Sequence, residues 1–446
     1  MDGMSARDRF RAGVLPWALW AGVAGCFGWF LLRAWKGLPT AANPYKGDFE
    51  HFYHAAVAVV RGEDLYASHT GGYIYPPLLA ALVTPLTYLD ARWAQVAWAG
   101  VNLALTGVVL WMAWRAWRER VGVPGDRLTA GALVLGAVLL TFEPVRWEFE
   151  EGQSDTLVIL GMVGALLWMD KRPWLAGVLT GFAVNIKYQA VVLLPYYLVR
   201  RRWSAAAGTA VGAVAFGLVP AVMIGWEKNL GYLGRALGGL GNLASGRGGV
   251  GEGTHNGLTW EKSVSVPSGL ARMLGEGTPV EWVYAGTGLV AGLMFAAGWW
   301  VYRGRGVAMF AGRGGLAEGR GLWRGVAGVE WCGLIVAVLA LSPQTMVRHS
   351  FILLPVHMLA AAVVLVPRAG VARWPVVAGV VVYQLGARLP PGNVEAFKPA
   401  LEWWQGVSGS TWCLLVMVLT LAWSGVEYAR ASSEGRALLD PPPGMR

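Results

Sequence analysis

Charged residues are scarce in this sequence. Asp, Glu, Lys and Arg make up 14% of the 446 residues, whereas a soluble domain carries roughly a quarter. Hydrophobic residues reach 55%, and the mean hydropathy is +0.45. These values exclude an ordinary soluble protein, and weak period-two alternation argues against an outer-membrane barrel. The composition therefore predicts an all-α polytopic membrane protein.

Cysteine is also rare. The three cysteines, Cys26, Cys332 and Cys413, lie in apolar runs without metal-ligand spacing, so neither a disulfide framework nor a zinc site is indicated, and we expect small buried residues. The segment Val23-Ala24-Gly25-Cys26 resembles a lipoprotein cleavage box. Because the apolar run continues to Leu32, we interpret it as an uncleaved first helix.

Basic residues outnumber acidic ones, which gives a net charge of +10. In a membrane protein Lys and Arg collect in cytoplasmic loops, so we attribute this excess to topology and expect no nucleic-acid partner. With the amino terminus inside, the basic clusters at 115–120, 171–172, 200–202, 303–324 and 430–436 all face the cytoplasm. The pattern predicts a multi-pass protein of the cell membrane whose long loops lie outside.

Apolar segments predict about twelve transmembrane helices in one domain that covers residues 1–446. The predicted spans are 14–32, 93–114, 128–142, 154–169, 173–186, 188–199, 205–224, 282–302, 325–341, 350–366, 376–385 and 411–423. A first external loop over 34–92 is predicted to carry interfacial helices. A glycine-rich external loop is expected over 225–281, without a core of its own, and a cytoplasmic tail over 428–446.

The stretch from Gly47 to Ala56 follows the first span and begins with a carboxylate, Asp48, between Gly47 and Phe49. A carboxylate at the hydrocarbon boundary has few reasons to be there unless it is used, so Asp48 is a candidate catalytic base. The competing interpretation is a helix cap, a position that Asp favours. The residues alone leave both interpretations open.

Cations at the same predicted outer face are suited to a phosphate. Lys187 stands at a junction between two apolar segments, and Arg348-His349 opens the tenth span. Arg offers a forked phosphate-binding donor, and His can donate a hydrogen bond or a proton. The alternatives are a snorkelling lysine and a plain interfacial anchor.

Further polar residues are candidates for binding a sugar or an acceptor. The carboxamide of Gln153 suits sugar hydroxyls, and Asp155 is either a helix cap or a second site carboxylate. Pro76-Pro77 is expected to aim Tyr75 and to start the next helix. Lys262, Ser263 and Ser265 contact a ligand or belong to an ordinary polar loop. The candidate sugar- or acceptor-binding residues are Gln153, Tyr75, Asn185 and Lys262.

An acidic group precedes Gln153. We interpret it as a solvated, partly paired rim. The alternative is a cation bound among these acids, although their spacing matches no recognised metal motif. Its members are Glu143, Glu148, Glu150 and Glu151, together with Arg146. Neither a metal nor another cofactor is predicted.

Several short motifs occur in a characteristic order. They are Gly47-Asp48-Phe49 through Ala55-Ala56-Val57-Ala58-Val59, Arg61-Gly62-Glu63-Asp64-Leu65-Tyr66, Tyr75-Pro76-Pro77, Gly152-Gln153, Arg172-Pro173-Trp174-Leu175-Ala176-Gly177, Ile186-Lys187 and Ser342-Pro343. Together they resemble glycosyltransferase family 87, polytopic enzymes of the GT-C fold similar to the polyprenyl-phosphate-mannose-dependent mannosyltransferases of mycobacterial lipid glycosylation. The resemblance extends from about Asp48 to Val366.

The resemblance implies a GT-C-like bundle, a polyprenyl-phosphate monosaccharide donor, and an acidic base in the first external loop, which maps to Asp48. The sequence departs from the family pattern at two places. Arg348-His349 stands where the family usually has paired histidines, and Ile186-Lys187 is followed by Tyr188-Gln189 in place of a proline-containing turn.

The hypothesis that follows is an inverting transfer of a hexose, mannose by resemblance, to a hydroxyl of a lipid or glycan acceptor outside the cytoplasm. Asp48 would take the hydroxyl proton, while Lys187, Arg348 and His349 bind the donor phosphate. A single essential carboxylate fits inversion. A transporter or lipid flippase is the alternative of another class, and a noncatalytic scaffold is a third.

Overall fold

The computed structural model describes residues 6–40, 47–67, 72–245, 257–275, 277–310, 319–388 and 395–439. Within these ranges the chain is helical and contains no β-strand, which confirms the all-α prediction. The helices are α1 (Ala6–Lys36), α2 (Phe49–Arg61), α3 (Pro77–Val83), α4 (Ala91–Val121), α5 (Arg127–Leu140), α6 (Phe142–Glu150), α7 (Asp155–Trp168), α8 (Pro173–Ile186), α9 (Leu193–Val199), α10 (Trp203–Leu218), α11 (Ala221–Ile224), α12 (Trp226–Ala244), α13 (Val266–Leu274), α14 (Val280–Arg303), α15 (Gly319–Leu341), α16 (Leu354–Leu365), α17 (Trp374–Arg388), α18 (Lys398–Gly406) and α19 (Gly409–Leu439). Short 3₁₀ segments are η1 (Thr84–Tyr88), η2 (Tyr188–Val192), η3 (Val347–Leu353) and η4 (Glu395–Phe397).

The chain is a polytopic membrane protein, but the predicted count of twelve spans is not confirmed. In the part of the chain that the structure describes, seven helices are long and apolar enough to cross a membrane. The count becomes eight if α5 and α6, which meet at a bend of 73°, form one broken span. Helices α7 and α8 have 14 residues each, or about 21 Å, which is shorter than the hydrocarbon core of roughly 30 Å.

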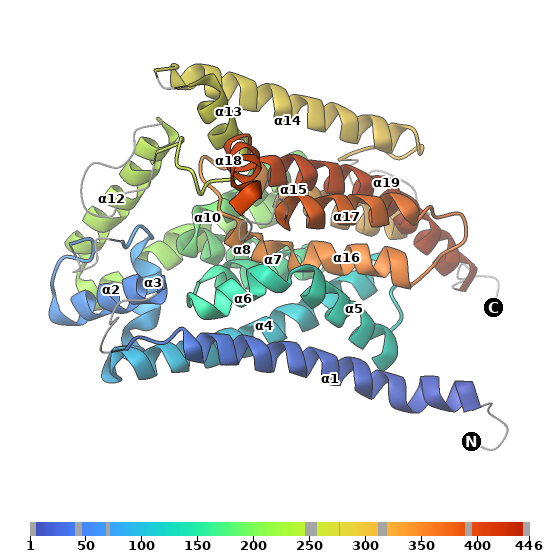
Figure 1. Cartoon of the computed structure of the whole chain (residues 1–446), viewed down its shortest axis with the longest axis horizontal. Helices are drawn as coiled ribbons and strands as arrows, with labels where there is room; N and C mark the ends of the chain where they lie inside the picture. Colours follow the sequence, from blue (N-terminus) through green and yellow to red (C-terminus); the bar gives the residue numbers. More distant parts are fainter. Residues whose placement is uncertain are drawn as a thin grey trace.

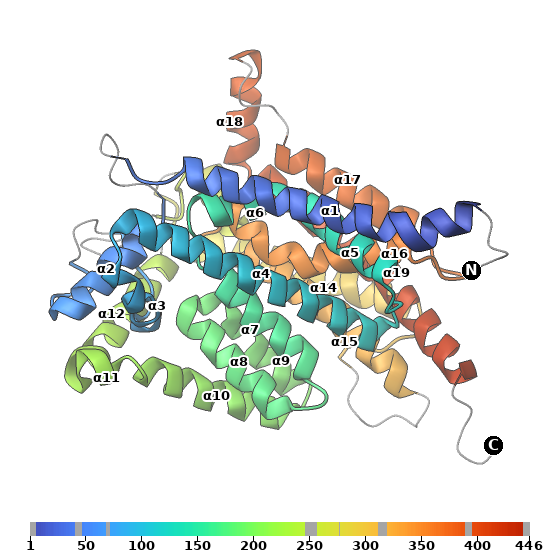
Figure 2. The same cartoon turned by 90° about the horizontal axis from the view of Figure 1, so that it is seen from below.

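The long helices form a layered bundle. Helix α1 lies along one side of the molecule beside α4 and α5, and α14 lies at the opposite side, next to α19 (Figure 1). The shorter helix α7 packs against α4, α8 packs on α7, and α10 packs on α8 and contacts α9, as the turned view shows (Figure 2). Most of the buried apolar side chains belong to one continuous core, so the bundle acts as one packed scaffold.

Helices α8 and α10 approach unusually closely because glycines line their contact. A Cβ added at Gly177 would lie 2.0 Å from the carbonyl oxygen of Ala205. The carboxamide of Asn185 joins the same two helices, since its Nδ2 donates to the carbonyl oxygens of Gly181 at 3.0 Å and Ala213 at 2.9 Å. A bulky side chain at position 177 would separate these helices and disturb the end of α8.

The segments predicted as external loops contain helices. As expected, short helices α2, α3 and η1 follow α1, and α3 begins at Pro77. The expectation of a loop without packing over 225–281 is wrong for its first part, because α12 extends over 226–244 and buries Tyr232 and Ala236 in the main core. The glycine-rich run over 246–253 lies outside the described residues.

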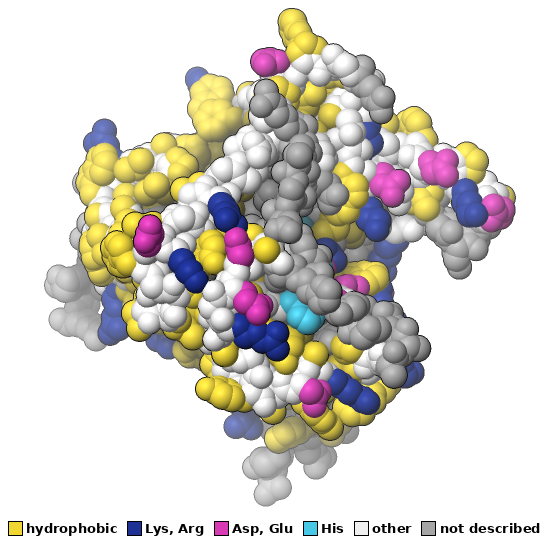
Figure 3. Space-filling model, turned by 90° about the vertical axis from the view of Figure 1, so that its left-hand side faces the viewer, with side chains coloured by type: hydrophobic (Ala, Val, Ile, Leu, Met, Phe, Trp, Pro, Cys, Tyr) yellow, Lys and Arg dark blue, Asp and Glu magenta, His cyan; other side chains and the backbone are white. Residues whose placement is uncertain are grey.

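Other expectations are met in part. Cys332 is buried, whereas Cys26 and Cys413 are only half-buried. Helix α19 continues to Leu439, well into the predicted tail. Figure 3 views the end of the molecule at which α2, α3 and α12 lie, where acidic and basic side chains sit among hydrophobic ones. That end carries the candidate site.

Candidate active site

Asp48 lies at the start of α2 and uses its side chain for tertiary contacts. It is the N-cap residue of α2, yet its carboxylate accepts no capping hydrogen bond, so the helix-cap interpretation is wrong for this side chain. Its Oδ2 instead accepts a hydrogen bond from Nε2 of Gln153 and pairs with Nη2 of Arg348 at 2.9 Å. Its Oδ1 accepts no hydrogen bond from any described residue. The side chain is 19% exposed.

Two glycines allow the loop of Asp48 to dock on the turn before α7. Gly47 has a φ of +82°, and a Cβ there would lie 2.8 Å from the carbonyl oxygen of Glu151. Gly152 has a φ of +65°, and a Cβ there would lie 2.6 Å from Cβ of Phe49. Because only glycine adopts these conformations without strain and leaves this space, the docking depends on both residues. The main-chain N–H of Phe49 completes it by donating to Glu151 at 3.0 Å.

Gln153 connects Asp48 to Lys187. Its side chain is 1% exposed. Its Nε2 donates to Asp48, and its Oε1 accepts from Nζ of Lys187 at 3.4 Å. Its carbonyl oxygen accepts from Nε1 of Trp98 at 3.2 Å and Nδ2 of Asn102 at 3.0 Å, so its backbone is held by α4.

Lys187 lies at the break between α8 and η2, as expected. Its backbone is extended there, and its Nζ forms an ion pair with Oδ1 of Asp155 at 2.6 Å. Both side chains are buried, and the ammonium group also lies 5.5 Å from the ring centroid of Tyr75. A snorkelling lysine is therefore the wrong interpretation. A buried cation stays charged only beside such a partner, and Asp155 serves that purpose.

Arg348 and His349 belong to η3. Arg348 pairs with Asp48, and Nδ1 of His349 accepts from the main-chain N–H of Met346 at 3.4 Å. The fold therefore brings η3 beside Asp48, although the two residues of the ion pair are 300 positions apart in the chain. The predicted phosphate-binding residues lie around Asp48 as a group.

His51 is a neighbour of this group that sequence reasoning did not single out. It lies on α2, and a Cβ at Gly72 would lie 2.2 Å from Cε1 of its ring. Burial lowers the pKa of His51, Asp48 partly opposes this effect, and Arg348 adds to it. The imidazole is therefore mostly neutral at pH 7. Its position three residues after Asp48, on the same helical face, was the available signal.

The acidic rim is confirmed only in part. Arg146 pairs with Glu143 at 2.8 Å and with Glu150 at 2.7 Å. Glu148, however, is 1% exposed, and its Oε1 accepts from the main-chain N–H and the hydroxyl of Thr156. Its assignment to a solvated rim was wrong, because α6 turns this carboxylate into the bundle and toward the start of α7.

Two cavities flank the Asp48 group. The first, of about 480 Å³, is mostly apolar; Tyr75, Lys187 and His349 line it together with apolar residues of α12, η2 and α15. The second, of about 880 Å³, is rich in charged side chains and includes Arg348. Both volumes fall in the range of roughly 300–1,000 Å³ that is typical of ligand pockets.

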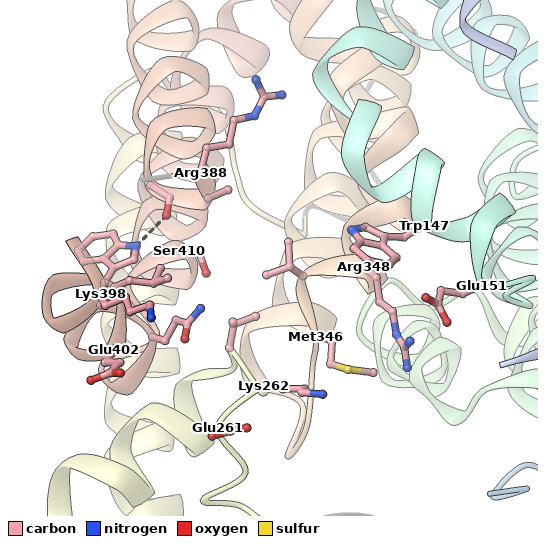
Figure 4. A pocket seen from close by; sticks show the side chains of 17 residues that line it. Trp147, Glu151, Glu261, Lys262, Met346, Arg348, Arg388, Lys398, Glu402 and Ser410 are labelled. Atoms are coloured by element: carbon pink, nitrogen blue, oxygen red, sulfur yellow. Dashed lines mark hydrogen bonds between the residues drawn. The ribbon is translucent and has the colours of Figure 1, made fainter. Parts of the chain in front are cut away.

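Figure 4 shows how the charged cavity is built. Trp147, Glu151 and Arg348 form one wall, Lys398 and Glu402 of α18 lie opposite, and Lys262 projects between them from the loop before α13. Lys262 is exposed and has no ion-pair partner among the described residues. The cavity therefore offers a free cation close to Arg348 and the Asp48 group.

Some predicted residues lie apart from this arrangement. Asn185 lines neither cavity, since its carboxamide is used between α8 and α10. Ser263 and Ser265 are buried, and Ser265 caps α13, so the polar-loop interpretation holds for them. In the described ranges, no three His, Cys, Asp or Glu side chains converge as a metal site would require.

A family comparison addresses the middle of the chain. The model of glycosyltransferase family 87 matches residues 73–315, just over half of the 446 residues. The matched stretch includes Gln153 and Lys187, whereas Asp48 and Arg348 lie outside it.

Curated relatives come from mycobacteria. The chain is 28% identical over 207 residues to a polyprenol-phosphate-mannose-dependent alpha-(1-2)-phosphatidylinositol mannoside mannosyltransferase of Mycobacterium tuberculosis. The aligned residues cover 43% of this chain and 48% of that protein. The protein of the same description from Mycolicibacterium smegmatis is 30% identical over 261 residues, or 51% of this chain and 55% of that protein. A Mycolicibacterium smegmatis polyprenol-phosphate-mannose-dependent alpha-(1-2)-phosphatidylinositol pentamannoside mannosyltransferase is 33% identical over 148 residues, or 33% of each chain. The chain thus spans about half the length of the first two relatives. No solved structure matches it significantly.

Proposed function

This chain belongs to glycosyltransferase family 87, and we propose that it transfers mannose from a polyprenyl-phosphate donor to a hydroxyl group of an anionic lipid acceptor similar to a phosphatidylinositol mannoside. The reaction would take place on the extracytoplasmic side of the cell membrane. The descriptions of the mycobacterial relatives support the donor and the acceptor class. The loop charges, which keep the amino terminus inside, support the side.

One observation carries the proposal: a carboxylate with one free oxygen is paired with Arg348, which lines the charged cavity, and is joined through Gln153 to Lys187, which lines the apolar cavity. Oδ2 of Asp48 is held by Gln153 and Arg348, while Oδ1 accepts no hydrogen bond from the described residues. A base held at one oxygen keeps the other oriented to receive a proton. Asp48 is therefore the group that would deprotonate the acceptor hydroxyl.

The apolar cavity suits the donor. A polyprenyl chain needs apolar walls, and this cavity has them on α15 and at Leu240 of α12. Lys187 and His349 line the same cavity and would bind the phosphate next to the chain. Arg348 would add a second positive charge from the side of Asp48.

The charged cavity suits the acceptor head group. Lys262 would bind the acceptor phosphate, and the indole of Trp147 offers an apolar face against which a sugar ring can pack. The mixed charges of Glu151, Arg348 and Lys398 would accept and donate hydrogen bonds to hydroxyl groups. An acceptor held here presents a hydroxyl toward Asp48.

The chemical step follows from these roles. The acceptor oxygen forms a bond to the anomeric carbon, its proton passes to Oδ1 of Asp48, and the bond between that carbon and the phosphate oxygen breaks. Lys187, Arg348 and His349 would stabilise the charge that develops on the leaving polyprenyl phosphate. Asp155 is paired with Lys187 and is 0% exposed, so it would not reach the anomeric carbon as a nucleophile. Attack opposite the leaving group therefore inverts the anomeric centre.

The direct test uses the purified full-length protein in detergent or nanodiscs with radiolabelled polyprenyl-phosphate mannose. With a phosphatidylinositol mannoside as acceptor we expect a labelled lipid product, and with a neutral glycolipid of similar glycan size we expect much less. The proposal would be overturned in favour of a transporter by two results together. The wild-type protein would label no lipid, and it would catalyse counterflow of the donor in proteoliposomes.

The acceptor site has its own variant. Lys262→Gln should raise the KM for the anionic acceptor by about tenfold, since one charge-assisted hydrogen bond of about 1.5 kcal/mol is lost. The KM for the donor should not change. Arg127→Gln, at an exposed cation at the start of α5, is the control. Equal acceptor KM values for both variants would move the anionic group away from Lys262.

A further inference from the structure

The carboxamide of Gln153 is used at both ends. Its N–H group donates to the carboxylate of Asp48, and its oxygen accepts from the ammonium group of Lys187. The two partners fix the orientation of the amide, because a carboxylate only accepts and an ammonium group only donates. Reversing the amide would break both contacts.

The surroundings of Gln153 hold it in place. Trp98 and Asn102 bind its carbonyl oxygen, and its main-chain N–H donates to the carbonyl oxygen of Glu148 at 2.9 Å. The left-handed Gly152 before it is packed against Phe49. Backbone contacts to α4, α6 and the Asp48 loop therefore leave this side chain little freedom to move toward a ligand.

Gln153 is also placed poorly for binding a sugar. It is 1% exposed, whereas the side chain of Asp48 is 19% exposed. A side chain that recognises hydroxyl groups must reach the space that the ligand occupies. The sequence-based expectation that Gln153 binds sugar hydroxyls therefore has no support from its surroundings.

We propose that Gln153 is a positioning residue that joins the base Asp48 to the donor-binding cation Lys187 and holds the free oxygen of Asp48 toward the acceptor. This inference rests on the proposed function. The connection continues to Asp155, which holds Lys187 from its other side. Gln153 thereby links the donor-binding cation of one cavity to the base that serves the acceptor in the other.

One consequence separates this role from a merely structural one. Without the hydrogen bond from Gln153, Oδ2 of Asp48 keeps only its contact with Arg348. The free oxygen then loses its fixed direction, which lowers the rate with bound substrates and leaves acceptor binding intact. The effect should therefore appear in kcat and not in the acceptor KM.

The experiment compares Gln153→Met and Gln153→Glu with the wild-type protein under saturating donor and acceptor. Gln153→Met keeps the approximate shape and removes both polar contacts. We expect kcat to fall about ten- to a hundredfold, the loss of one hydrogen bond to a charged group, with the acceptor KM unchanged. Gln153→Glu keeps the length of the side chain but cannot donate to Asp48, because a carboxylate only accepts. It should therefore lower kcat at least as much, again with the acceptor KM unchanged.

Gln95→Met is the matched control. Gln95 is 3% exposed on α4, and its Nε2 has no partner among the described residues, so this change alters a buried glutamine whose amide nitrogen holds no site residue. It should leave kcat and the acceptor KM as in the wild type.

Three outcomes would overturn the role of Gln153 while the wild-type protein remains active. One is an unchanged kcat in Gln153→Met. Another is a higher acceptor KM at constant kcat, which would indicate sugar binding. The third is a smaller folded fraction whose kcat per folded molecule equals that of the wild type, which would indicate a structural role. An inactive wild-type protein would instead overturn the proposed function.

Discussion

Replacing Asp48 with asparagine removes one negative charge and almost no volume. The asparagine oxygen can take the place of Oδ2 and still accept from Gln153 and Arg348. Its amide nitrogen would then stand where Oδ1 stands, and an amide cannot accept a proton from a hydroxyl group. The substitution thus removes the base and retains the contacts that hold the loop.

The expected magnitudes differ widely for activity and stability. A general base contributes about 10²- to 10⁴-fold to the rate, so kcat should fall by that factor. Stability should fall by only about 1–2 kcal/mol, because two hydrogen bonds become uncharged and Arg348, whose side chain is 23% exposed, can still reach water. Unfolding of the variant cannot therefore account for the lost rate.

The assay measures initial rates at saturating donor and acceptor, donor affinity, and the thermal unfolding midpoint. Asp90→Asn is the control. Asp90 also precedes a helix, but its Oδ1 caps α4 by accepting from Arg92 at 3.0 Å and Trp93 at 3.2 Å, a bond that asparagine also makes. A general base contributes about 10²-fold or more to the rate. A kcat of Asp48→Asn within about threefold of that control would therefore refute the assignment of Asp48 as a base.

Further predictions concern the surroundings of the base. Lys187→Met leaves Asp155 buried without its cation, so we expect a loss of about 3–5 kcal/mol in stability. Adding Asp155→Leu should restore the midpoint of thermal unfolding but not the affinity for the donor. Recovered donor affinity in the double variant would contradict the role of Lys187 in phosphate binding. Gly152→Ala should lower the free energy of unfolding by about 1–3 kcal/mol and should lower kcat, because φ is +65° and the new methyl group would meet Phe49. An unchanged midpoint of thermal unfolding would contradict the docking of the Asp48 loop on the turn before α7. Val338→Trp fills the apolar cavity and should raise the KM for a long-chain polyprenyl donor more than the KM for a short-chain one. Equal changes in the two KM values would show that the polyprenyl chain binds elsewhere.

Local sequence was sufficient for several features of the fold. The apolar runs predicted the helices, Pro77 marked the start of α3, and Lys187 marked the end of α8. Such signals act within a few residues, through hydrophobic periodicity and backbone geometry. The same local reasoning failed for α12, whose glycines suggested a loop, because packing of Tyr232 and Ala236 outweighs a low helix propensity.

Site residues were predictable as types and not as contacts. Asp48, Lys187 and Arg348 stood out because charges are rare beside apolar segments. The contact between Asp48 and Lys187 runs through Gln153, which is 105 residues from Asp48 in the chain. No local pattern indicates such a pairing. Glu148 illustrates the same limit, since its burial depends on the direction of α6 at the bend after α5.

The sequence by itself determined that this chain is a helical membrane protein, that its charges gather at a few places, and that its motifs belong to one family. The tertiary structure alone decided which oxygen of Asp48 is held and which is free, that Lys187 is neutralised by Asp155, and that a charged cavity lies beside an apolar one. The physical reason is the distance along the chain over which each kind of interaction acts. Hydropathy and backbone preference act along neighbouring residues, whereas ion pairs and cavities arise where helices far apart in the chain pack together.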